Sequence, residues 1–178
     1  CMDMAVQIRD LKKGFDGNEI LKGVTLSAPR GMITTIIGSS GSGKSVMIKH
    51  LVGLLRPDAG SIIVDGQDLT ELSPKELRKV RRKFGLLFQH SALFDSMTVE
   101  ENVGFPLHER TSMKRQEIAD KVTDILERLN LPGIHKKYPS ELSGGMKKRV
   151  GLARAIVLEP QFMIYDEPTT GLDPIMIR

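Results

Sequence analysis

The sequence contains very little cysteine, tryptophan or aromatic surface. Among its 178 residues there is one Cys, no Trp and only 4% aromatic residues. A single Cys excludes a disulfide scaffold and a zinc site built from several cysteines, and it is typical of a reducing compartment. The few aromatics leave little material for the base-stacking surfaces that bind single-stranded nucleic acid.

Long hydrophobic runs and a strong charge of one sign are also missing. No apolar run approaches the ~18 residues that a membrane-spanning helix needs. The first residues, CMDMAVQIRD, lack the charged start, apolar centre and cleavage site of a secretory signal. The 26 basic and 22 acidic residues give a net charge of only +4. These absences favour a cytosolic protein, and the length suits one α/β domain.

Strands are predicted from the spacing of apolar residues. Apolar and polar residues alternate around Val6 and Ile8 and again over residues 24–28, with a turn at residues 14–18. Residues 32–37 form an apolar run without alternation, which is typical of a buried parallel strand. Further strands are expected over residues 62–64, 84–88 and 162–165.

Helices are predicted from apolar periodicity and from capping patterns. Apolar side chains recur at helical spacing from Ile48 to Leu55. The segments at residues 73–76 and 98–101 have the Ser/Thr-x-x-Glu spacing of a capping box, which marks a helix start. Two more helices are expected over residues 118–129 and 144–158.

The clearest chemical motif is a loop rich in glycine and serine. It fits the phosphate-binding pattern G-x-x-x-x-G-K-[ST] and comprises Gly38, Ser39, Ser40, Gly41, Ser42, Gly43, Lys44 and Ser45. Backbone N–H groups of such a loop curve around phosphate oxygens. Lys44 would reach the β and γ phosphates, and the Ser45 hydroxyl would ligate magnesium. A flexible turn is the alternative, but the position between a strand and a helix favours nucleotide binding.

Two adjacent acids follow the strand predicted at residues 162–165. A carboxylate at the C-terminal end of a parallel strand would face the phosphate loop, so Asp166 could hold magnesium directly or through water. Glu167 could orient or deprotonate an attacking water. Acids alone could merely end a strand, and it is the phosphate loop upstream that favours the catalytic interpretation.

A second glycine motif, Ser143-Gly144-Gly145, opens the helix predicted over residues 144–158. The N–H groups of a helix start bind anions, so this segment could also hold phosphate. The alternative is an ordinary Ser N-cap next to a glycine turn.

Taken in order, these three motifs resemble the ATPase domain of ABC proteins. Gln89 stands where that family has its Q-loop glutamine, and Phe15 where it has an aromatic that stacks on adenine. The alternative for Gln89 is a solvated strand end. The alternative for Phe15 is an aromatic residue of the core or of a turn. Residues 170–173 resemble the family's D-loop.

The resemblance implies the fold and its division. It predicts an α/β P-loop NTPase with a mostly parallel core sheet, a helical subdomain and a small N-terminal antiparallel β region. The core would comprise residues 1–94 and 159–178, and the helical subdomain about residues 95–158.

The resemblance also implies ATP and Mg²⁺ as ligands and a head-to-tail dimer of two copies. Each ATP would lie between one copy's phosphate loop, with Val46 after it, and the other copy's Ser143, Gly144 and Gly145. Glu167 would be the general base, aided by Lys44 and Gln89. Magnesium would be held by Ser45, Gln89 and Asp166, and Asp173 would contact the opposite copy.

Three segments resemble the Mla/Mce branch of the family, whose ATPases drive phospholipid or sterol-like lipid movement in bacterial envelopes. They are residues 43–46, 89–99 and 138–149. This resemblance implies a transporter ATPase at the cytoplasmic face of the bacterial inner membrane, with a membrane permease as partner and no nucleic acid. Three alternatives stay open: a soluble ABC-type ATPase of DNA repair or translation, an ABC ATPase for another substrate, and a binding switch without turnover.

The switch histidine, which this family places some tens of residues after the base glutamate, has no counterpart in the sequence. All four histidines precede Glu167 and lack metal-ligand spacing. The sequence is therefore expected to stop after the D-loop, and the chain to hydrolyse ATP poorly or not at all.

Two further segments concern possible partners. The apolar residues after Gln89 should form helix-packing core, and the resemblance implies that their region also receives a cytoplasmic helix of the permease; they are Leu93, Phe94, Met97, Val99, Val103 and Phe105. The run from Lys75 to Lys83 is the most basic. A solvated helix face is its simpler interpretation, and binding of anionic lipid head groups or nucleic acid the sharper one.

Overall fold

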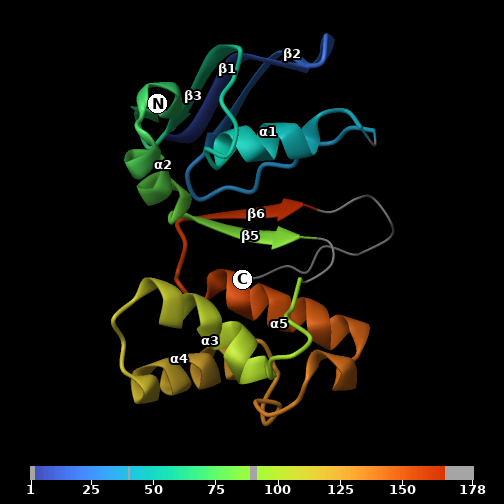
Figure 1. The fold of residues 1–178 in the computed structure, drawn as a ribbon, viewed down its shortest axis with the longest axis vertical. Helices are drawn as coiled ribbons and strands as arrows, with labels where there is room; N and C mark the ends of the chain where they lie inside the picture. The colour runs from blue at the N-terminus through green and yellow to red at the C-terminus, as the bar shows by residue number, and fades with distance from the viewer. Residues whose placement is uncertain (1–2, 40, 89–91, 167–178) are drawn as a thin grey trace. The chain divides into compact units, whose positions relative to one another are not determined.

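The computed structural model describes residues 3–39, 41–88 and 92–166, and for Phe88 and Asp166 it describes the backbone. The chain divides into two compact units, Cys1–Lys83 and Phe84–Arg178. Figure 1 shows the elements of both units by label. None of the described helices is long and apolar enough to cross a membrane.

The first unit is built on a four-stranded antiparallel sheet with the order β2-β1-β3-β4, of which Figure 1 labels β1, β2 and β3. Its strands are β1 (Met4–Phe15), β2 (Asn18–Pro29), β3 (Ala59–Val64) and β4 (Gln67–Asp68). The turn between β1 and β2 contains Asp16 and Gly17, both at positive φ (50° and 82°). A two-residue hairpin turn requires this conformation and favours Asp-Gly. The antiparallel region expected at the N-terminus is confirmed.

Alternate residues of β1 form the core of this sheet. Val6 lies opposite Val64 and Ile8 opposite Ile62, and all four are buried. Burying one such side chain stabilises the fold by about 1.5–3 kcal/mol. The alternation of the sequence therefore indicates the inward face of β1 correctly.

Two helices accompany the sheet, α1 (Lys44–Leu51) and α2 (Pro74–Arg81), with a 3₁₀ turn at Leu69–Glu71. The predicted capping box of α2 is confirmed, because the Ser73 hydroxyl accepts from the Glu76 amide and the Glu76 carboxylate accepts from the Ser73 amide at 2.8 Å. The predicted helix at 48–55 ends earlier, at Leu51. Gly53 adopts a φ of 68°, a left-handed conformation that terminates helices.

The apolar run from Met32 to Ile37 is not a strand, contrary to the prediction. Ile33 and Ile37 are 95% and 88% exposed. A strand needs a neighbour that completes its backbone hydrogen bonds, and none of the described strands pairs with this run. An apolar run predicts burial, but it does not indicate which strand would pair with it.

A bridging carboxylate, Asp65, ties the end of β3 to two distant cations. It accepts from Arg30 Nη2 at 2.5 Å and from Lys83 Nζ at 2.8 Å, and it is largely buried. The hydrogen bond from Lys83, followed by that from Arg30, holds the pKa of Asp65 below its ordinary value. The stability of the first unit should consequently depend on pH in the acidic range.

Asp65→Asn is expected to flatten that pH dependence. The carboxylate's contribution is present above its unfolded pKa of about 4 and is lost as the pH falls through the lower folded pKa. The free energy of unfolding, measured by urea titration from about pH 7 to about pH 3, should fall less steeply in the variant. Asp124→Asn, which breaks an exposed pair with Arg128, should behave like the native chain. Identical slopes for Asp65→Asn and the native chain would contradict the expectation.

The second unit combines two parallel strands with three helices. β5 (Phe84–Phe88) and β6 (Phe162–Asp166) pair in parallel, with Phe84 opposite Phe162 and Phe88 opposite Asp166. The helices are α3 (Val99–Arg110), α4 (Arg115–Arg128) and α5 (Gly144–Ile156), preceded by a 3₁₀ turn at Pro139–Glu141. Their shared core contains Val99, Val103, Leu107, Val122, Leu126 and Val150. The helices and strands predicted in this half are confirmed.

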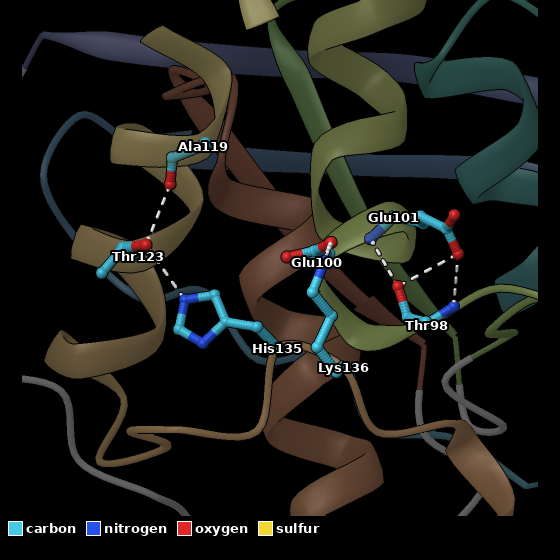
Figure 2. A network of polar contacts seen from close by, with 7 residues as sticks. All are labelled: Thr98, Glu100, Glu101, Ala119, Thr123, His135 and Lys136. Atoms are coloured by element: carbon cyan, nitrogen blue, oxygen red, sulfur yellow. Dashed lines mark hydrogen bonds and ion pairs between the residues drawn. The ribbon is translucent and has the colours of Figure 1, made fainter. Parts of the chain in front are cut away.

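The start of α3 is fixed by a capping box and by two backbone hydrogen bonds. Thr98 and Glu101 form the predicted capping box, which Figure 2 shows with its dashed lines. The amides of Val99 and Glu100 donate to the carbonyls of Lys137 and His135 at 2.8 and 3.0 Å. The early N–H groups of α3 thus find partners in the segment that leads to α5.

Candidate functional site

The loop rich in glycine and serine closes around the end of the Lys44 side chain. Nζ of Lys44 donates to the carbonyls of Gly38 and Ser39, the latter at 2.8 Å, and to the Ser42 hydroxyl at 3.3 Å. The Ser42 amide also donates to the Ser39 carbonyl at 3.2 Å. The loop and its lysine therefore form one hydrogen-bonded unit, with the ammonium group held inside the loop.

Gly43 connects this loop to α1 and leaves no space for a side chain. Its φ of 90° lies in the left-handed region. A Cβ there would lie 2.8 Å from the Leu21 side chain and 3.3 Å from the Ile20 carbonyl, both on β2. The loop therefore rests on β2 in a way that only glycine permits.

The first turn of α1 provides a positive electrostatic environment. It contains no acidic residue, and its N-terminal end carries the positive end of the helix dipole. Ser45 is exposed there and Val46 is half-buried. A helix start next to a fixed ammonium group suits a polyphosphate.

The residues present fit magnesium rather than a metal that needs a protein cage. Within residues 3–39, 41–88 and 92–166, no three His, Cys, Asp or Glu side chains gather into a metal site. Mg²⁺ takes one or two protein ligands and completes its shell with water and phosphate oxygens. The exposed Ser45 hydroxyl in the first turn of α1 is a donor of that kind.

Phe15 lies at the end of β1, beside the hairpin turn, and is 41% exposed. Nζ of Lys13 lies 5.4 Å from the centre of its ring, and Lys13 also pairs with Asp58 at 2.7 Å. Phe15 is therefore a surface aromatic with a cation beside it. Such a ring can stack on a base, and it adds little to the core.

The start of α5 is open on its outer side. The Ser143 hydroxyl accepts from the Met146 amide at 3.2 Å, as an N-cap does. Ser143, Gly144 and Gly145 are exposed, and a Cβ on either glycine would find no atom within 4 Å. The glycines are thus not required by contacts within the described chain, in contrast to Gly43.

The carboxyl ends of β5 and β6 lie side by side, since Phe88 pairs with Asp166. Asp166 is therefore at a strand end, as predicted. Ser40, Gln89, Glu167 and Asp173 lie outside the described residues. The phosphate loop belongs to the first unit, and the ends of β5 and β6 and the start of α5 belong to the second.

Sequence reasoning missed the buried polar residue Asn102, which organises a turn. It is 0% exposed, and its side chain accepts from the Phe94 amide at 2.8 Å and donates to three carbonyls at 3.0–3.1 Å. These carbonyls belong to Phe94, Met97 and Thr98, so Asn102 fixes the turn before α3. An Asn between the core positions Val99 and Val103 was the available signal.

The turn that Asn102 fixes presents an aromatic side chain. Phe94 is 43% exposed, makes an edge-on contact with Phe105 at 5.2 Å and lies 5.5 Å below the Arg154 guanidinium. Val99 and Val103 are buried, as the helix-packing interpretation predicted. The apolar group after Gln89 thus divides into core residues and an exposed ring.

Comparison with known proteins connects the chain to one family. The family model described as "ABC transporter" matches residues 21–170. The "Probable ribonucleotide transport ATP-binding protein mkl" of Mycobacterium leprae is 50% identical over 98% of this chain and 50% of its own length. "Protein TRIGALACTOSYLDIACYLGLYCEROL 3, chloroplastic" of Arabidopsis thaliana is 46% identical over 97% of this chain and 52% of its own. The methionine import ATP-binding protein MetN of Rhizobium johnstonii is 43% identical over 97% of this chain and 48% of its own length.

Solved structures show the same similarity. CbiO1 of Clostridium perfringens, part of the transporter complex cbiONQ, has a TM-score of 0.85 and 34% identity, over 97% of this chain and 69% of its own. The dimeric cassette MJ0796 bound to ADP and Pi has a TM-score of 0.81 and 33% identity, over 94% of this chain and 76% of its own. The chain spans about half the length of the curated relatives it matches.

Proposed function

Because this chain belongs to the ABC transporter family, we propose that it binds ATP with Mg²⁺ and hydrolyses it to power a membrane transporter. The observation that carries this proposal is the phosphate loop, in which Lys44 is held at the start of α1 by Gly38, Ser39 and Ser42. A loop already closed around its lysine loses little conformational entropy when a polyphosphate binds.

In the proposed reaction, water attacks the γ-phosphorus of ATP, and ADP and phosphate leave. Lys44 and the first N–H groups of α1 offset the charge that develops on the phosphate oxygens. Glu167 accepts the proton of the attacking water, and Gln89 positions that water. Ser45, Asp166 and Gln89 would hold Mg²⁺, which would offset negative charge on the phosphate groups.

We further propose that ATP binds between two copies arranged head to tail. The exposed Ser143, Gly144 and Gly145 of one copy would complete the site on the other copy's phosphate loop. The open space around both glycines supports this arrangement. Dimeric MJ0796 is a family precedent for the pairing of two cassettes.

Gly145→Ala should weaken ATP-dependent dimerisation without harming the fold. The added methyl meets nothing within the described chain, and Ala is favoured over Gly in a helix by up to about 1 kcal/mol. Dimerisation should be measured by sedimentation velocity with ATP in a Glu167→Gln background, which keeps ATP intact. We expect the dimerisation affinity to fall at least tenfold, which is about what the loss of one charge-assisted hydrogen bond causes. Lys148→Ala, an exposed change on the same helix, is the control, and equal dimerisation of Gly145→Ala and this control would contradict the proposal.

We propose that the transported substrate is a phospholipid or a related lipid, and that the chain works at the cytoplasmic face of the bacterial inner membrane. The resemblance of residues 43–46, 89–99 and 138–149 to the Mla/Mce branch supports this, as does a relative named after a galactolipid. Other relatives are named for ribonucleotide transport and methionine import. Mass spectrometry of the transporter purified with its membrane partners distinguishes these classes, and a bound nucleotide or amino acid in place of lipid would reject the lipid proposal.

The exposed ring of Phe94 is the proposed contact with the membrane permease. Leu93 packs against the helical core, so Phe94 is the sharper position to change. Phe94→Asp should lower recovery of the permease with this subunit at least tenfold, since it places a charge in an apolar contact. ATP binding by the same variant should be unchanged. Normal recovery of the permease would show that the contact lies elsewhere.

A further inference from the structure

Helix α2 carries a set of cations that the proposed reaction does not use. Two basic residues of this segment have structural partners: Arg81 donates to the carbonyls of Val52 and Gly53 at 3.1 and 2.9 Å, and Lys83 pairs with Asp65 at 2.8 Å. The others are exposed and take part in no ion pair within the described part of the chain; they are Lys75, Arg78, Lys79 and Arg82. We call these four side chains the basic face.

The basic face is one continuous stripe on a rigid element. Its members follow the i, i+3, i+4, i+7 spacing that places residues on one side of a helix. The opposite side is buried through Leu77 and Val80. Since Ser73 and Glu76 cap the helix, the stripe is held in a defined orientation on the first unit.

We propose that the basic face binds the surface of a membrane that contains anionic phospholipid. Cations on one side of a helix are attracted to the negative surface of such a membrane. Single-stranded nucleic acid fits less well, because α2 contains no aromatic side chain for base stacking. The inference goes beyond ATP hydrolysis, which involves none of these residues.

The test is binding of the full chain to vesicles. Vesicles of phosphatidylglycerol and phosphatidylcholine should be compared with vesicles of phosphatidylcholine alone, by co-sedimentation at low and at high salt. The test variant changes Lys75, Arg78, Lys79 and Arg82 to Gln, and the control changes four other exposed cations, Lys22, Arg110, Arg115 and Lys137, to Gln. Both variants remove the same charge, so only position differs. The thermal midpoint and ATP affinity of each variant should match those of the native chain.

The native chain and the control should bind the anionic vesicles, and the test variant should bind at least tenfold less. Each cation near such a surface contributes about fivefold to binding, and the effect should weaken in high salt. Equal binding by the two variants would overturn the proposal. So would binding to a DNA duplex, but not to vesicles, that depends on the same four residues. Because ATP affinity is measured separately, failure here leaves the proposed function standing.

Discussion

Lys44→Ala should lower the affinity of the chain for ATP by about a hundredfold. The ammonium group sits inside the phosphate loop, held by Gly38, Ser39 and Ser42, and it would exchange these neutral contacts for charged phosphate oxygens. Two charge-assisted hydrogen bonds of about 1.5 kcal/mol each correspond to that loss. Isothermal titration calorimetry with ATP and Mg²⁺ gives the dissociation constants directly.

Lys49→Ala is the matched control for this substitution. Lys49 is an exposed cation in the last turn of the same helix, away from the loop. Removing it changes the net charge equally, so the two variants separate a local contact from a general electrostatic effect. If both variants bind ATP equally, Lys44 is not a phosphate ligand.

Gly43→Ala should destabilise the first unit by about 3 kcal/mol and abolish ATP binding. An alanine at a φ of 90° costs about 1–2 kcal/mol, and its methyl would lie 2.8 Å from the Leu21 side chain and 3.3 Å from the Ile20 carbonyl. The loop would have to move away from β2 to relieve the contact, which displaces Lys44. Urea unfolding measures the stability, and calorimetry measures ATP binding.

Gly66→Ala tests the two causes separately. Gly66 has a similar φ of 76°, but a Cβ there would meet nothing within 4 Å. It should therefore cost only the conformational part, about 1 kcal/mol, and leave ATP binding intact. Equal destabilisation by the two changes would mean that the contact with β2 is unimportant.

Local chemistry explains most of what could be predicted about the fold. The capping boxes at Ser73 and Thr98 involve residues three positions apart, so the sequence contains the whole interaction. The buried face of β1 follows from simple alternation, and the helices of the second unit follow from apolar spacing.

The wrong prediction of a strand at residues 32–37 and the missed role of Asn102 have a common cause. Both depend on partners that are not adjacent in the sequence pattern. The run at residues 32–37 was predicted as a strand from apolarity, which says nothing of the neighbour that must pair with it. Asn102 owes its role to the turn at Phe94, whose conformation no spacing rule predicts. Likewise, the contact of Gly43 with Ile20 and Leu21 joins residues that only the fold brings together.

The candidate site could be predicted in part for the same reason. The phosphate loop is contiguous, and its closure around Lys44 agrees with the motif. The Ser143 N-cap and the end of β6 are local features as well. How these parts combine around ATP depends on contacts between distant residues and between copies, which local spacing does not contain.

The central claim is that ATP binds between two copies. Mixing two variants that each dimerise poorly tests this claim most directly. Lys44→Ala damages the phosphate loop and Gly145→Ala the start of α5, both in the Glu167→Gln background. If ATP binds between two copies, a pair made of one of each contains one site with both parts intact. Sedimentation velocity of the equimolar mixture with ATP and Mg²⁺ should then show clearly more dimer than either variant alone. A mixture that forms no more dimer than the average of its two components would contradict the account.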